Sequence, residues 1–167
     1  MAVTYDKIAT TTVSGTPSDV TFSSISGSYT DLVLICQMKT SALATIYLQF
    51  NSDTGSNYSY SNLAGSPAGA NAGRSSSATI NRITNYAYPD NTFNTNAIVN
   101  FMNYSNSTTY KTFLSRANNA SGADNATEVL AGLWSSTAAI STIKVYPSGG
   151  ATWSTGSTFT LYGILKA

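Results

Sequence analysis

The side chains with the greatest capacity for chemistry in this sequence are seven carboxylates and one thiol. No histidine is present, so the commonest general base, the commonest metal ligand and every Ser-His or Cys-His nucleophile pair are missing. The single thiol, Cys36, lies in the apolar run DLVLICQMKT, which predicts a buried hydrophobic residue and not a reactive one. Zinc sites take several Cys and His ligands, which this composition cannot supply.

The carboxylates show no spacing that predicts catalysis. A glycosidase needs two of them about 5–10 Å apart across a cleft. Most of the acids stand beside turn signals or at strand starts, where Asp bonds to its own backbone. The seven are Asp6, Asp19, Asp31, Asp53, Asp90, Asp124 and Glu128. We therefore expect a protein that is not an enzyme, with no catalytic residue, no metal site and no cofactor.

The stretch NSDTGSNYS, residues 51–59, has oxygen side chains at alternate positions around a glycine. A calcium loop of the EF-hand type needs flanking helices and a bidentate glutamate at its end, and both are missing from the sequence around it. An Asx-rich hairpin turn is the interpretation that we favour.

Eleven tyrosines are the remaining side chains that could bind a ligand, because aromatic faces stack on sugar rings and on nucleobases. Most are expected to be strand residues with one buried edge. Tyr58, Tyr60, Tyr86 and Tyr88 stand next to the most irregular part of the chain. They are the candidates for an exposed cluster that contacts a partner or a glycan.

The composition indicates a folded β protein. Charged residues make up 9% of the chain, against roughly 25% in a typical soluble domain, while β-branched and aromatic residues are frequent. The net charge is +1 and the eight basic residues are dispersed, which argues against a nucleic-acid partner. No apolar run approaches the ~20 residues of a membrane span, and the first residues do not have the pattern of a signal peptide.

Strand and turn signals alternate along the chain at short spacing, without a helical period. The run YTDLVLICQMKT is apolar on both faces, so it predicts a central strand buried on both sides. Residues 51–77 are rich in Gly, Ser, Asn and Ala and predict a long loop with at most a short strand around Tyr58. ATINRITNYAY predicts a further strand. The closing WSTGSTFTLYGI predicts a half-buried strand in which Gly163 allows a close approach.

These signals predict an all-β fold. We expect one domain over residues 1–167, an antiparallel β-sandwich of the jelly-roll or Greek-key type with about nine or ten strands and the long loop at 51–77.

Several segments are also similar to a known family. They are YDKIATTTVSG, VTFSSI, YTDLVL, YLQFNSDTGSNYS, the pair Asn103-Tyr104, Trp134 followed by AISTIKVY, and the most specific element, the closing GSTFTLYGI. In these the chain resembles small virion structural proteins of tailed bacteriophages, which are frequent in phages of cyanobacteria and other aquatic bacteria. The resemblance implies a β-sandwich on the virion exterior, made in the host cytoplasm, with no catalytic residues.

We consider three functions, of which the first two follow from the resemblance and the third from the composition alone. The favoured one is a capsid decoration (cement) protein that binds the major capsid protein on the head as a homo-oligomer, a homotrimer by expectation. The chain is compact, with no fibrous segment, and its Ser, Thr and Asn side chains suit many short hydrogen-bonded contacts. The second is a receptor-binding tail-fibre or appendage tip that recognises a host surface glycan through residues 51–77. The third is a non-viral carbohydrate-binding module.

Overall fold

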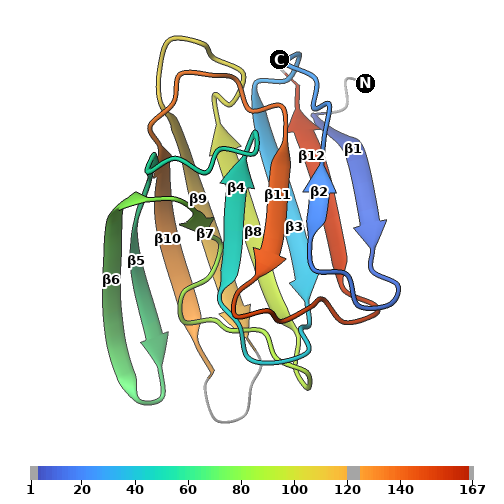
Figure 1. Cartoon of the computed structure of the whole chain (residues 1–167), viewed down its shortest axis with the longest axis vertical. Coiled ribbons are helices and arrows are strands. Elements are labelled where there is room, and N and C mark those ends of the chain that lie inside the picture. Colours follow the sequence, from blue (N-terminus) through green and yellow to red (C-terminus); the bar gives the residue numbers. More distant parts are fainter. Residues whose placement is uncertain (1–3, 120–124, 166–167) are drawn as a thin grey trace.

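Two antiparallel sheets pack face to face in the computed structural model, which describes residues 4–119 and 125–165 (Figure 1). The larger sheet has eight strands, in the spatial order β1 (Tyr5–Thr12), β12 (Thr158–Ile164), β3 (Asp31–Met38), β8 (Thr95–Met102), β9 (Lys111–Asn119), β10 (Thr127–Trp134), β5 (Tyr58–Ser66) and β6 (Gly69–Ala78). The smaller sheet has four, in the order β2 (Val20–Phe22), β11 (Ile143–Pro147), β4 (Ile46–Phe50) and β7 (Asn81–Arg82). The predicted all-β sandwich is confirmed, and the described residues contain twelve strands where about nine or ten were expected.

Eight of the strands have the connectivity of a jelly roll. They are β1, β2, β3, β4, β7, β8, β11 and β12. Counted from one to eight along the chain, they lie in the order 1-8-3-6 in the larger sheet and 2-7-4-5 in the smaller one, which is the arrangement of two interwound Greek keys. The other four strands form two hairpins, β5–β6 and β9–β10, that extend the larger sheet beyond the jelly roll.

The core lies between the two sheets, and aromatic rings join them. Phe50 of β4 contacts Phe101, Phe113 and Trp134 of the larger sheet, with ring centroids 5.7, 6.0 and 5.5 Å apart. Such rings bury large apolar areas and prefer tilted or edge-to-face geometry. Phe50 therefore anchors the smaller sheet over both the jelly roll and the inserted β9–β10 hairpin.

The segment 51–77 is not a long loop, so that prediction is wrong. Its residues from Tyr58 onward form β5 and most of β6, and β5 pairs with β10 along its length. Gly, Ser and Ala have little strand propensity of their own, which is why the sequence signal was weak. Backbone pairing with β10 and burial of Tyr58, Tyr60 and Asn62 against the core compensate for that weakness.

The strand predicted at ATINRITNYAY is reduced to the two residues of β7. The segment that follows crosses the inner side of the inserted strands, and buried polar side chains hold its backbone there. The Oε2 atom of Glu128 accepts hydrogen bonds from the amides of residues 85–87, at 2.8, 2.9 and 3.2 Å. The Ser115 hydroxyl donates to the Ile83 carbonyl at 2.8 Å, and the side-chain amide of Asn119 donates to the Tyr88 carbonyl at 3.2 Å. These groups satisfy the backbone without a β-ladder.

β3 lies centrally between β12 and β8, but the smaller sheet covers only one of its faces. Leu32, Leu34 and Cys36 are buried on the covered face, and Val33 is buried on the other face, at 4% exposure, whereas Ile35 on that face is 42% exposed. The prediction of a strand buried on both sides is therefore wrong for Ile35. The reason is that the smaller sheet packs on one face of the larger sheet (Figure 1), and no second sheet of the described residues packs on the other.

Candidate docking face

Aliphatic side chains line up across the uncovered side of the larger sheet. Strand pairing places Ile35 opposite Ile98, Ile98 opposite Arg116, Arg116 opposite Val129, and Val129 opposite Leu63. Directly paired residues point to the same side of a sheet, so this row crosses β3, β8, β9, β10 and β5. We call the surface made by the outward side chains of β3, β8, β9, β10, β5 and β6 the open face.

The open face is more apolar than a solvated sheet surface. Its most exposed aliphatic side chains are Ile35, Leu63, Ile98, Met102 and Val129, which are 38–69% exposed. Half-buried Leu114 and Leu133 lie among them. When one face of a sheet packs on the core and the other faces water, each strand normally alternates buried apolar residues with exposed polar ones. A contiguous exposed apolar patch marks an interaction site. The sequence carried this signal in β3 and β8, where both faces are apolar.

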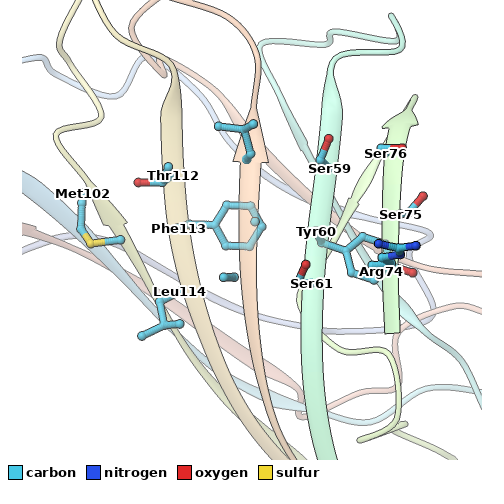
Figure 2. A pocket seen from close by; sticks show the side chains of 13 residues that line it. Ser59, Tyr60, Ser61, Arg74, Ser75, Ser76, Met102, Thr112, Phe113 and Leu114 are labelled. Carbon is cyan, nitrogen blue, oxygen red and sulfur yellow. The ribbon is translucent and has the colours of Figure 1, made fainter. Parts of the chain in front are cut away.

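The open face is hollowed over the inserted hairpins. One hollow, of about 870 Å³, lies over β9, β10, β5 and β6 (Figure 2). Figure 2 shows Met102 and Leu114 on one side of it, Tyr60 and Arg74 on the other, and the Phe113 ring between them.

A second hollow of about 660 Å³ lies around Leu63, and a third of about 440 Å³ around Ile98 and Arg116. Together they make a broad, shallow surface, with the shape of a protein contact and not of an enclosed small-molecule site.

Two arginines give the open face a positive character. Arg116 lies in the apolar row between Ile98 and Val129, and Arg74 lies on β6. The one ion pair among the described residues joins Lys144 to Asp19 at 3.5 Å, on the smaller sheet. Among the described residues, the guanidinium of Arg116 donates only to Asn100 Oδ1, at 3.5 Å. A partner that covers the open face therefore has to supply acceptors for both arginines.

Tyr58 and Tyr60 do not belong to an exposed cluster, and the prediction is wrong for these two residues. Tyr58 is fully buried, its hydroxyl accepts a hydrogen bond from the Phe50 amide at 3.1 Å, and burial raises its pKa to about 12. Tyr60 is 8% exposed, and the Arg82 guanidinium lies 5.0 Å from its ring centroid. Both side chains point inward because they alternate with Ser59 and Ser61 along β5.

Tyr86 and Tyr88 are half-buried. They lie in the segment that crosses the inner side of β9 and β10, where the Tyr86 amide donates to Glu128. Burial is the main cause that raises the pKa of Tyr88, with smaller contributions from Tyr86 and Glu128. The structure therefore separates all four predicted tyrosines from the aliphatic row of the open face.

Asp53 and Lys111 hydrogen-bond to backbone groups or to neutral side chains. Burial opposes ionisation of Asp53, but hydrogen bonds from Trp134 Nε1 at 2.6 Å, Asn57 Nδ2 at 2.9 Å and the Gly55 amide at 2.8 Å outweigh it and lower its pKa. This is the Asx-rich turn expected at 51–59, but it is not the expected hairpin, because it joins β4 of the smaller sheet to β5 of the larger sheet. Burial lowers the pKa of Lys111, whose Nζ donates to two carbonyls, and raises the pKa of the buried Cys36 thiol.

The described residues contain no group of three or more His, Cys, Asp or Glu side chains that could hold a metal ion. Asp124, one of the seven acids, lies outside the described residues. Within the part of the chain that the structure covers, no helix is long and apolar enough to cross a membrane.

No protein-family model matches the chain, and no curated protein and no solved structure matches it either. Its function has to be inferred from the open face and from the sequence segments quoted above.

Proposed function

We propose that the chain is a non-enzymatic structural protein of a tailed-phage virion, a capsid decoration protein that binds the head as a homo-oligomer and stabilises it. The observation that carries the proposal is the open face, an uncovered sheet surface with a row of aliphatic side chains in which Arg116 is the one charged member. In this proposal the open face lies on the major capsid protein. The resemblance to virion structural proteins supports a location on a virion, and the open face is the surface that would contact the partner.

The side chains of the open face favour a protein partner over a glycan. Sugar sites use exposed aromatic rings as stacking platforms. No aromatic side chain points outward from the described strands between β3 and β6, and the two rings that line the hollow of Figure 2, Tyr60 and Phe113, are only 8% and 2% exposed. The outward rings of Tyr5 and Tyr162 lie at the far end of the sheet, on β1 and β12, and pack edge to face at 6.2 Å. This distribution favours head decoration over a receptor-binding tip that recognises a host glycan.

The chemistry of the open face also defines its partner. Leu63, Ile98 and Val129 call for aliphatic side chains opposite them, because burying such surface stabilises a contact by about 25 cal/mol per Å². Arg116 and Arg74 call for carboxylates at the matching positions. The proposed partner is a protein surface with an apolar centre and acidic side chains.

The position of the protein on the particle tests the proposal directly. A density map of the virion should show the sandwich in many copies over the head, with the open face toward the capsid shell. Density confined to the tail would overturn the decoration proposal and favour the fibre-tip alternative.

Variants test whether the open face makes the contact. The substitutions Ile98→Asp and Val129→Asp place charges in the aliphatic row without touching the core, so the protein should fold but no longer co-sediment with heads that lack it. Leu43→Asp is the matched control, because Leu43 is an aliphatic residue that is 60% exposed in the β3–β4 connection. Equal binding by all three variants would show that the open face is not the contact.

A further inference from the structure

The two sheets formed by residues 4–119 and 125–165 have four edges, and only one of them is long and unprotected. In the smaller sheet the edge strands are short: β2 has three residues and β7 has two. In the larger sheet, β1 carries Asp6 and Lys7 and has a register shift between Lys7 and Ala9. Short edges, charges and bulges are the features that keep sheets from pairing with other chains. The fourth edge, β6, has ten residues, and Arg74 is its one charged side chain.

β6 also gains little from its own molecule. None of its residues is buried. Its backbone pairs with β5, and the one other hydrogen bond that the described residues make to it runs from the Ser66 hydroxyl to the Gly69 carbonyl. The outward N–H and C=O groups of β6 therefore have no protein partner, which is the arrangement that accepts an additional strand.

We propose that β6 pairs antiparallel with β6 of a second copy of this chain, about a two-fold axis perpendicular to the sheet at Ala72. The ladder with β5 is regular from Gly69 to Ser75 and shifts only between Tyr58 and Tyr60. A pair centred on Ala72 uses this whole regular stretch in both copies. Ala72 lies opposite Ala72 of the second copy, and Arg74 lies opposite Ala70.

The regular stretch from Gly69 to Ser75 is centred on Ala72, and charge excludes the neighbouring registers on the Arg74 side. Centring the pair on Arg74 would set two guanidinium groups directly opposite each other, and centring it on Gly73 would set them diagonally opposite, which destabilises a strand pair. Centring it on Ala72 separates them by four residues, about 13 Å along the strand. That distance exceeds the Debye length of about 8 Å at physiological ionic strength.

The second copy is a better occupant of this edge than another strand of the same protein or a different partner. Pairing β6 with β1 of the next copy would oppose the charged, bulged edge and leave an open chain of molecules, whereas the two-fold pair is closed. The two-fold axis also places both open faces on the same side of a continuous sheet. This inference rests on the proposed function in naming how the homo-oligomer forms, and it replaces the expected trimer with a two-fold unit.

Disulfide cross-linking of the full-length protein tests the register. Ala72→Cys should form a disulfide-linked dimer under mild oxidation, because residues directly opposite in a strand pair lie within disulfide range. The unsubstituted chain is the first control, since its one thiol, Cys36, is buried. Leu63→Cys is the second: its side chain is 69% exposed on the neighbouring strand, but the two copies would lie about 14 Å apart, too far for a disulfide.

The mass in solution tests the pairing without any cysteine. Analytical ultracentrifugation should find a dimer of the unsubstituted chain, a monomer for Ala72→Lys, and a dimer for the matched control Ala72→Ser. A monomer or trimer of the unsubstituted chain would overturn the proposal, as would a dimer that Ala72→Lys leaves intact. These results are independent of location: a β6-paired dimer found on the tail would refute head decoration alone, and a head protein without β6 pairing would refute this inference alone.

Discussion

At the scale of single residues, the buried polar side chains fix irregular backbone in place. Glu128 is 1% exposed and binds three consecutive amides through Oε2, while Oε1 has no hydrogen-bond partner among the described residues. Asn119 accepts from the Ala126 amide at 2.7 Å and donates to the Tyr88 carbonyl. A carboxylate that could have been a catalytic candidate by type alone therefore has a structural use in the fold.

The hydrogen bonds of Asp53 predict a specific dependence of stability on pH. The pKa of Asp53 is lower in the folded protein than its ordinary value of 3.8, so its ionised form stabilises the fold above that value, and this contribution is lost as the pH falls through the lowered folded pKa. At neutral pH, Asp53→Asn should reduce the free energy of unfolding by about 1–2 kcal/mol, because charged hydrogen bonds to Trp134 and Asn57 become neutral.

Urea unfolding followed by tryptophan fluorescence at decreasing pH measures this effect. The difference between the unsubstituted chain and Asp53→Asn should be constant above about pH 4 and shrink below it. Asp19→Asn is the control, because its ion pair with Lys144 is partly exposed and is expected to contribute less than about 1 kcal/mol. A difference that persists undiminished at the lowest pH would show that the charge of Asp53 is not what stabilises the turn.

At the scale of elements, strands with clean alternation could be predicted and strands made of small residues could not. β4 buries Ile46, Leu48 and Phe50, and β12 buries Phe159 and Leu161, as the sequence indicated. β6 has no such pattern, because none of its side chains enters the core and its strand form depends on pairing with β5. At ATINRITNYAY the sequence predicted a strand, but only Asn81 and Arg82 form one. Side chains from distant strands bind the backbone of the remaining residues in place of a β-ladder.

The glycine in β12 also has a structural reason. A Cβ atom at Gly163 would lie 2.3 Å from Cδ1 of the Tyr29 ring, so the close approach expected at this position is made by a side chain and not by a neighbouring backbone. The Tyr29 hydroxyl donates to Asp6 Oδ2 at 2.7 Å. The ring therefore spans β12 and reaches the edge strand β1.

Gly163→Ala should force the Tyr29 ring out of this position and reduce the free energy of unfolding by about 1–3 kcal/mol, the usual cost of overpacking. Urea unfolding of Gly163→Ala, Tyr29→Ala and the double variant forms a mutant cycle. Most of the cost of Gly163→Ala should vanish in the Tyr29→Ala background, where the ring is absent. An equal cost in both backgrounds would place the strain in the backbone of β12 instead.

At the scale of the whole molecule, the sequence predicts the sandwich but not which surface is left uncovered. Alternation shows which residues of one strand share a face, but it does not show which strands join which sheet. Here both inserted hairpins join the larger sheet and enlarge its outer surface, while the four-stranded sheet packs on its inner side. This topology leaves Ile35, Ile98 and Val129 exposed on the outer face, whereas Tyr58 and Tyr60, which the sequence suggested as ligand-binding residues, are buried in the core.

The composition of the open face predicts how the assembled protein responds to solvent. In the proposed contact, aliphatic side chains are buried and short hydrogen bonds form, and the charged side chains of the open face between β8 and β6 are two arginines. Ion pairs that become buried in a contact are screened little by salt. Binding to heads should therefore persist in concentrated sodium chloride and be lost in urea below the concentration that unfolds the sandwich, because urea weakens the burial of apolar and peptide groups. Co-sedimentation measured across both titrations, with circular dichroism to follow the fold, separates the two effects. A steep loss of binding between low and moderate salt would show that exposed charges, and not the aliphatic row, hold the protein on its partner.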